Sequence, residues 1–471
     1  MEYPAEVQNR IQAVEHGLLQ AITIHGQPQK GMDMLERMSF YRVPGVSVAV
    51  INAGKLEWAS GYGVLDASGA DPVTPQTLFQ AASISKPVTA MAALYLVQTG
   101  ALALDDDVNT RLRSWHIPEN EYTESHKVTL RRLLSHTAGL TVHGFPGYAS
   151  NDELPTLLQV LDGLPPANTN PIRVFTTPGG EFSYSGGGYI VLQQLIQDVT
   201  GQPFPDFMAA NLLRPLSMDR STYAQPLPVE LASNAAVGHT LIGQPVGGKW
   251  HTYPEMAAAG LWTTPTDLAR YIIEIQLSAQ GKSNRILTQE MTAEMLTPQM
   301  GTQGLGPQSG GNGELRWFSH GGDNFGFKCG FLALLSTGQG VVIMVNSDNL
   351  NLISEIMRSV ASVYDWPALP EWSMLQTEER SIISFDPGIY QELTGAYQFQ
   401  DFPDTTIHVT VTDGNLHVSW AEGLSYELYP DSELSYFTAE DGIRFEFHRN
   451  DQGKINEMVV TGIGLAIRVQ N

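Results

Sequence analysis

Residues 45–51 read GVSVAVI, residues 52–54 read NAG and residues 55–61 read KLEWASG. Two runs of strand-forming residues on either side of a short turn predict a hairpin, and a hairpin requires an antiparallel sheet. Far along the chain, residues 330–335 and 341–345 form a second apolar pair around a turn. Because both hairpins are apolar on both faces, we expect them to lie at the centre of one covered sheet.

The chain between the two hairpins has helical patterns. Residues 84–99 and 188–200 each have helical periodicity and are followed by a glycine, and residues 5–22 predict an amphipathic helix before the first hairpin. The stretch from about 90 to 300 is mostly helix and loop. Strands at both ends with helices between them predict an α+β fold, in which an antiparallel sheet is flanked by helices and interrupted by a helical insert.

The composition changes near residue 366. Residues 366–389 are proline-rich without periodicity and predict a linker. In residues 407–411 and 415–420, apolar and polar residues alternate, which predicts two short strands. A glycine-containing turn signal lies between them at residues 413–414, and two more occur at residues 441–442 and 452–453. We therefore predict a first domain at 1–365, a linker at 366–389 and a small all-β, barrel-like domain at 390–471.

The composition excludes several classes of protein. With 471 residues, 42% of them hydrophobic and 16% charged, the chain has enough apolar material for a sizeable core and is not a disordered protein. Its net charge of −23 repels nucleic acid and anionic membranes, so neither is expected as a partner. The single cysteine, Cys329, excludes an intramolecular disulfide and a cysteine-built metal site. No apolar run approaches about 18 residues, so no transmembrane helix is expected. No basic leader is present, so we expect a cytoplasmic protein, or an exported one whose leader has been removed.

The first chemical motif is the S-x-x-K pattern formed by Ser83 and Lys86. A serine hydroxyl needs a base to become a nucleophile, and a lysine three residues later on a helix lies one turn along the same face. At the start of the predicted 84–99 helix, the serine would also experience the positive end of the helix dipole. The bare pattern equally fits a capped helix start with a solvated lysine.

Two further stretches carry side chains or backbone groups that suit acyl chemistry. Residues 182–189 read FSYSGGGY, and the hydroxyl of Tyr184 on such a glycine-rich loop can relay a proton, although a tyrosine on a flexible loop is the alternative. Residues 319–323 read SHGGD, directly before the second hairpin. Glycines at a strand edge let a substrate approach the backbone, where an N–H can complete an oxyanion hole with the N–H of Ser83. The alternative for His320 is a loop histidine.

The three motifs occur in the order S-x-x-K, tyrosine, H-G-G, together with LLSHTAGL at 133–140 and GLWTTPTDLA at 260–269. In this the chain resembles the serine β-lactamase and penicillin-binding-protein-like superfamily over about residues 30–365, in particular the class C β-lactamases, related esterases and D-aminopeptidases. The resemblance implies a β-lactamase/transpeptidase-like fold. From residue 390 on, the chain resembles the lipocalin-like domain appended to some hydrolases of this group.

The resemblance implies roles for individual residues. Ser83 becomes the nucleophile, Lys86 its base partner, and Tyr184 the hydroxyl that shares proton transfer with Lys86. The backbone N–H groups of Ser83 and Asp323 become the oxyanion hole.

The same resemblance places His320, Gly321 and Gly322 where these enzymes carry K-T-G or H-x-G, beside the substrate. Two positions depart from the pattern. Gly186 replaces the asparagine common in Y-x-N, and His320 replaces the lysine of K-T-G, which weakens the binding of a carboxylate at neutral pH. Both departures argue against an efficient β-lactamase and for an esterase, amidase or peptidase.

The sequence therefore predicts a serine hydrolase that cleaves an ester or amide bond (peptide, D-aminoacyl or β-lactam-like) of a small molecule through an acyl-enzyme. Nothing in it calls for a cofactor or a metal: G-x-S-x-G and H-E-x-x-H are absent, and the Walker-like residues 243–249 are followed by Trp250. His136 is interpreted as a structural loop histidine. Acyl transfer and a non-catalytic binding protein remain as alternatives, and the C-terminal domain is a candidate binding module, lid or contact of a homo-oligomer.

Overall fold

The computed structural model describes residues 3–28, 31–369, 372, 375–384, 387–421 and 423–469. The chain divides into two compact units. Unit 1 contains the residues up to Val7 together with Val43–Ile353, and unit 2 contains Gln8–Arg42 together with the residues from Ser354 onward. Each unit has its own sheet and its own apolar interior.

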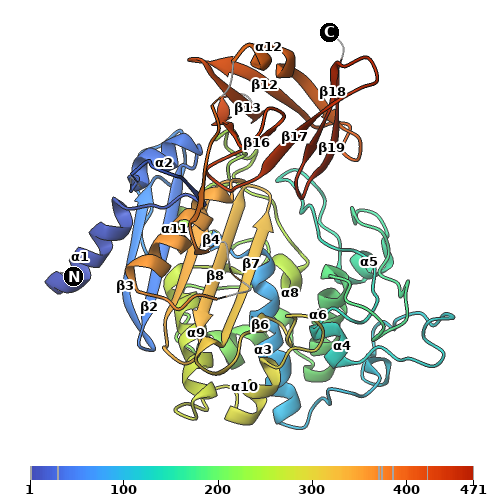
Figure 1. Cartoon of the computed structure of the whole chain (residues 1–471). Coiled ribbons are helices and arrows are strands. Elements are labelled where there is room, and N and C mark those ends of the chain that lie inside the picture. Colours follow the sequence, from blue (N-terminus) through green and yellow to red (C-terminus); the bar gives the residue numbers. More distant parts are fainter. Residues whose placement is uncertain are drawn as a thin grey trace. The chain divides into compact units, whose positions relative to one another are not determined.

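The central sheet of unit 1 is built from both ends of that unit. Its six strands have the order β3-β2-β9-β8-β7-β6, and every neighbouring pair is antiparallel. Val46 pairs with Val345, so strands almost 300 residues apart lie side by side, blue beside orange in Figure 1. The strands of unit 1 are β2 Gly45–Asn52, β3 Lys55–Gly63, β4 Phe79–Gln80, β5 Trp262–Thr263, β6 Gln308–Gly310, β7 Trp317–Asn324, β8 Phe327–Leu334 and β9 Gly340–Val345.

The two predicted hairpins are present, and three of their four strands are central. β2, β8 and β9 are almost completely buried, as their unbroken apolar sequences require. The prediction that both hairpins lie at the centre is wrong for β3, which forms an edge of the sheet. Only Trp58 and Ala59 of β3 are buried, and its first residues, Lys55 and Leu56, are exposed.

Helices occupy the stretch between β3 and β7, as the predicted insert requires. Helix α9 packs on β2, β3 and β9, and α3, α6 and α8 pack on one another. The helices of unit 1 are η1 Ala82–Ile84, α3 Ser85–Gln98, η2 Val108–Thr110, α4 Leu130–Leu134, α5 Leu157–Asp162, α6 Gly186–Thr200, α7 Phe204–Met208, η3 Ala209–Leu213, η4 Ala232–Asn234, α8 Met256–Ala259, α9 Pro265–Ala279, α10 Gln289–Met295 and η5 Gly313–Leu315.

Two helix boundaries differ from those expected. The helix predicted at 5–22 is α1, Ala5–Glu15, because the N–H of Leu18 binds the carbonyl of Met32 at 2.9 Å instead of continuing the helix. Helix α6 begins two residues earlier than predicted, at Gly186. Its cap is Ser185, whose Oγ accepts the N–H of Gly188 at 3.0 Å, so the glycine run forms the first turn of a helix and not a loop.

Unit 2 contains a nearly closed antiparallel barrel. Its nine strands have the order β14-β13-β12-β11-β19-β18-β17-β16-β15, so the two edge strands are neighbours in the sequence. Aromatic rings fill the interior, with Tyr397 and Tyr436 each in contact with Phe447. The barrel elements are α12 Tyr390–Leu393, β11 Gly395–Phe399, β12 Thr406–Thr412, β13 Asn415–Ala421, β14 Leu424–Glu427, β15 Tyr429–Pro430, β16 Ser435–Phe437, β17 Arg444–Arg449, β18 Ile455–Val460 and β19 Gly464–Arg468.

The remaining elements of unit 2 come from both ends of the chain. Strand β1, Ile22–Ile24, pairs in parallel with β10, Glu378–Arg380, which lies inside the stretch predicted as a linker. This pairing groups Gln8–Arg42 with the C-terminal residues, whereas the sequence placed them in a domain spanning 1–365. Helix α2, Met34–Phe40, and turn η7, Pro387–Ile389, also belong to unit 2, and α11, Asn351–Val363, begins in unit 1 and continues into it.

Parts of the predicted linker, including Pro370 and Asp386, lie outside the described residues. In the described part of the chain, none of the helices combines the length and the apolar character needed to span a bilayer.

Candidate active site

Ser83 lies on a single 3-10 turn, η1, that leads directly into α3. The residue before it, Ala82, has φ of +47°, a left-handed conformation that costs a non-glycine residue energy. Ser83 is partly exposed, whereas Lys86 is 2% exposed. The Nζ of Lys86 lies 2.9 Å from the Oγ of Ser83, so the predicted i, i+3 pair is a direct hydrogen bond.

Lys86 has a second partner that fixes its nitrogen. Its Nζ donates to the carbonyl oxygen of Ala258 at 2.9 Å. Ala258 belongs to α8, which packs against α3 and η1. With two hydrogen bonds from one buried nitrogen, the lysine side chain has a defined position beside the serine.

Tyr184 lies immediately before the cap of α6, and its ring faces the lysine. The Nζ of Lys86 is 5.0 Å from the centroid of the Tyr184 ring and 5.9 Å from that of Tyr189. Among the described residues, no hydrogen bond joins the hydroxyl of Tyr184 to Ser83 or Lys86. The structure therefore brings the three predicted residues together, with the face of the tyrosine ring, and not its hydroxyl, against the lysine nitrogen.

The H-G-G stretch lies on β7, at a part of the strand with an open edge. Among the described residues, β6 pairs only with the first three residues of β7, up to Ser319. Beyond that point β7 packs against η1. A Cβ atom on Gly322 would lie 2.4 Å from the carbonyl oxygen of Ala81 and 2.4 Å from the sulfur of Cys329. Glycine at 322 is therefore what allows β7 to approach the turn that carries Ser83.

Replacing Gly322 by alanine is expected to force β7 away from η1. Overpacking of this kind costs about 1–3 kcal/mol, and we expect the free energy of unfolding to fall by that amount. Gly321→Ala is the matched control, because the nearest atom to its added Cβ is 3.8 Å away. Denaturant unfolding of both variants measures the difference, and equal stabilities would contradict the close approach.

His320 and Asp323 flank the glycines and differ in charge. Burial, and next the charge of Lys86, lower the pKa of His320 to about 4, so its imidazole is neutral at pH 7. Its Nδ1 donates to the carbonyl of Gly321 at 2.6 Å. The carboxylate of Asp323 forms an ion pair with Lys328, which also binds Asp348 at 3.0 Å. The side chain of Asp323 thus has its own partner, separate from its backbone N–H.

The place next to Tyr184 that an asparagine would occupy in a Y-x-N motif is filled. A Cβ atom on Gly186 would lie 2.9 Å from the ring of Phe145 and 3.1 Å from the carbonyl oxygen of His143. That carbonyl also accepts the N–H of Gly186 at 3.0 Å. A side-chain amide at position 186 would therefore require both neighbours to move.

The described residues contain no group of three or more histidine, cysteine, aspartate or glutamate side chains placed to hold a metal ion. The groups described near Ser83 are a lysine, a tyrosine, the neutral His320 and backbone N–H groups.

Comparison with known proteins identifies the family. The family model described as Beta-lactamase matches residues 33–358, well over half of the chain. The chain belongs to the beta-lactamase family. The match includes all the residues described above around Ser83 and ends before the C-terminal barrel.

Curated relatives match this beta-lactamase-family protein over part of its length. Protein flp of Staphylococcus aureus (strain N315) is 29% identical over 255 residues, which are 52% of this chain and 48% of the relative. Unguisins hydrolase ungD' of Aspergillus campestris is 30% identical over 236 residues, or 47% and 41% of the two chains. The chain thus spans about half the length of the curated relatives it matches.

Solved structures match the fold over nearly the whole chain. The octameric penicillin-binding protein homologue from Pyrococcus abyssi is 21% identical with a TM-score of 0.63, covering 92% of this chain and 98% of its own. The structure of SurE with D-Leu is 22% identical with a TM-score of 0.54, covering 93% and 97%. The likeness confirms the predicted α+β, penicillin-binding-protein-like fold with a C-terminal barrel-like sheet.

The structure adds residues that the sequence reasoning did not assign to the site of this beta-lactamase-family protein. The carbonyl of Ala258 gives no signal in a sequence, because any residue can supply a backbone oxygen. Phe145 is likewise invisible as a neighbour of Gly186. The sequence assigns His136 only a structural role, and in the structure its ring centroid lies 4.2 Å from that of Tyr184. The signal for it was present in the LLSHTAGL stretch at 133–140.

Proposed function

We propose that this protein is a serine hydrolase that cleaves an ester or amide bond through an acyl-enzyme. The observation that carries the proposal is the 2.9 Å contact between the Oγ of partly exposed Ser83 and the Nζ of buried Lys86. A nucleophile with a base in hydrogen-bond reach, and with that base held by a third group such as the carbonyl of Ala258, is the arrangement that covalent catalysis requires.

Each group in the site has a step in the proposed reaction. Lys86 takes the proton of Ser83 as Oγ attacks the substrate carbonyl, and the N–H groups of Ser83 and Asp323 hold the oxyanion. Tyr184 gives a proton to the leaving group and regains one from Lys86. A water molecule, which gives its proton to Lys86, then attacks the acyl carbonyl, and Lys86 returns that proton to the Oγ of Ser83 as the acid leaves. The close approach of Gly322 to Ala81 supports this arrangement, because it brings the following residue of β7 towards η1.

Two features support an ester or amide other than a β-lactam as the substrate. Phe145 occupies the space beside Gly186 where an amide side chain would bind an acyl-amide group. His320 is neutral at pH 7, so it offers a substrate carboxylate no positive charge. The name of the Aspergillus campestris relative, a hydrolase of unguisins, also supports hydrolysis.

Covalent labelling tests the proposal. A fluorophosphonate is expected to form one adduct, on the peptide that contains Ser83, and to block turnover of p-nitrophenyl acetate in step with labelling. A panel of acyl p-nitrophenyl esters, D- and L-aminoacyl anilides and nitrocefin is expected to show faster turnover of esters or anilides than of nitrocefin. Full turnover with Ser83 unlabelled would remove it as the nucleophile, and the absence of both adduct and turnover would favour a binding protein.

A further inference from the structure

The backbone on both sides of Tyr184 is held by one residue, His136. The N–H of Ser183 donates to the carbonyl oxygen of His136 at 2.8 Å, and the N–H of Ser185 donates to its ring Nδ1 at 3.1 Å. Between these two bonds, the ring of Tyr184 lies 4.2 Å from the imidazole, with 31° between the planes. A single residue thus contacts the tyrosine ring and both of its chain neighbours.

The bond to Ser185 determines which ring nitrogen of His136 carries the proton. Because Nδ1 accepts an N–H, it carries a lone pair, and the ring proton lies on Nε2. A second proton would have to go on Nδ1, where it would face the N–H of Ser185 and break the bond. Burial, followed by the charge of Lys86, lowers the pKa of His136 well below its usual value. The imidazole is therefore neutral at neutral pH.

The backbone of His136 also limits which residues can replace it. Its φ is +56°, in the left-handed region where asparagine, aspartate and histidine are enriched among non-glycine residues. Asparagine also carries a side-chain oxygen at the distance of Nδ1 from the backbone, whereas glutamine carries its amide at the distance of Nε2. His136→Asn therefore keeps the acceptor for Ser185, and His136→Gln removes it.

We propose that His136 is a positioning residue that holds Tyr184, through the Nδ1 acceptor, where the phenol hydroxyl can give its proton to the leaving group. The proposal rests on the proposed role of Tyr184 in the hydrolase reaction. It assigns a role to the LLSHTAGL stretch, which touches the tyrosine segment but does not include the nucleophile.

The test uses a series of aryl acetates whose leaving phenols differ in pKa. Proton donation makes the acylation rate insensitive to the leaving group, so wild type is expected to give a nearly flat plot of log kcat/KM against leaving-group pKa. His136→Ala and His136→Gln are expected to give a steep plot, with kcat/KM for the poorest leaving group reduced by about 10²-fold and kcat/KM for p-nitrophenyl acetate reduced much less. His136→Asn is expected to restore the flat plot.

His143→Ala is the matched control. The ring of His143 lies 4.9 Å from that of Tyr184, but its side chain makes no hydrogen bond to Ser183 or Ser185 in the described part of the chain. We expect its plot to remain flat, since the contact of Gly186 with residue 143 uses the backbone carbonyl.

Three results would overturn the proposal: a flat plot for His136→Ala and His136→Gln, a plot for His136→Asn as steep as theirs, or an equally steep plot for His143→Ala. If His136→Ala does not fold, the glutamine and asparagine variants decide the question between them. Fluorophosphonate labelling of Ser83 in each variant tests the nucleophile independently of the positioning residue. If wild type is not labelled, Ser83 is refuted as the nucleophile, and that result says nothing about the role of His136.

Discussion

Replacing Ser83 by alanine is expected to lower kcat/KM for p-nitrophenyl acetate by about 10⁴-fold or more. The alanine removes the atom that forms the acyl-enzyme, and loss of a nucleophile leaves only the residual catalysis that binding and the oxyanion donors supply. Steady-state kinetics with a fluorophosphonate-titrated enzyme measure the change. The folded state should be little affected, because Ser83 is partly exposed and its Oγ bonds only to Lys86 among the described residues.

Ser85 provides the matched control for this experiment, since it lies in the same motif. Its Oγ accepts the N–H of Leu261 at 3.0 Å and the residue is fully buried. Ser85→Ala leaves that buried N–H unpaired, which costs about 1–3 kcal/mol of stability, but it keeps the Ser83–Lys86 pair. We expect near wild-type turnover below the unfolding temperature. Loss of turnover in Ser85→Ala with full activity in Ser83→Ala would transfer the nucleophile to the second serine.

Replacing Glu355 by alanine is expected to destabilise unit 2 by about 3–5 kcal/mol. Glu355 is fully buried on α11, and Oε1 accepts from Arg37 Nη2 at 2.6 Å and from the hydroxyl of Tyr41 at 2.7 Å. Its Oε2 accepts from Arg37 Nε at 3.0 Å. Without this carboxylate, the buried guanidinium of Arg37 loses both of its short charged bonds and keeps only the more distant carboxylate of Glu440, at 3.8 Å. Denaturant unfolding followed by circular dichroism measures the loss.

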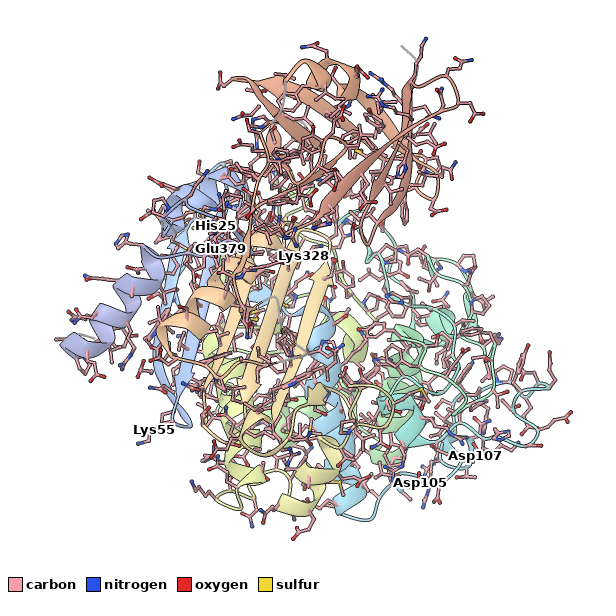
Figure 2. The ribbon with its side chains drawn as sticks, viewed as in Figure 1. His25, Lys55, Asp105, Asp107, Lys328 and Glu379 are labelled. Atoms are coloured by element: carbon pink, nitrogen blue, oxygen red, sulfur yellow. The ribbon has the colours of Figure 1, made fainter. Side chains whose placement is uncertain are left out.

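An exposed histidine–carboxylate contact in the same unit is the control for Glu355→Ala. His25 and Glu379 point towards one another, with 3.0 Å between Nδ1 and Oε1, and their side chains are 70% and 61% exposed (Figure 2). Glu379→Ala is expected to change the stability by less than about 1 kcal/mol. The double variant Arg37→Met/Glu355→Leu should recover most of the loss, because it removes both charges together. A single Glu355→Ala variant as stable as wild type would contradict the account.

Local patterns in the sequence were sufficient for most of the elements. The strands β2, β8 and β9 were predictable because a strand buried on both faces has an unbroken apolar sequence, and Gly414 marked a hairpin turn of the barrel. The edge position of β3 was not predictable, because a hairpin turn shows that two strands pair but not whether a further strand pairs with either of them. The proximity of Ser83 and Lys86 also follows from local geometry, because three residues make about one helical turn.

The environment of that pair depends on parts of the chain that no local pattern connects. The carbonyl of Ala258 reaches Lys86 across 172 residues, and the ring of Phe145 closes the space beside Gly186. His136 reaches the flank of Tyr184 from 49 residues away. In unit 2, Arg37 meets Glu355 across 318 residues.

The amino-acid sequence alone thus determined the sheet, the helical insert, the C-terminal barrel and the spacing of serine and lysine, because hydrophobic periodicity and turn residues act over a few neighbouring positions. Only the tertiary structure decided which carbonyl holds Lys86, which histidine holds Tyr184 and which segment joins Gln8–Arg42 to the C-terminal unit. Those contacts depend on how distant surfaces fit together, and a period of two or of 3.6 residues carries no information about that fit.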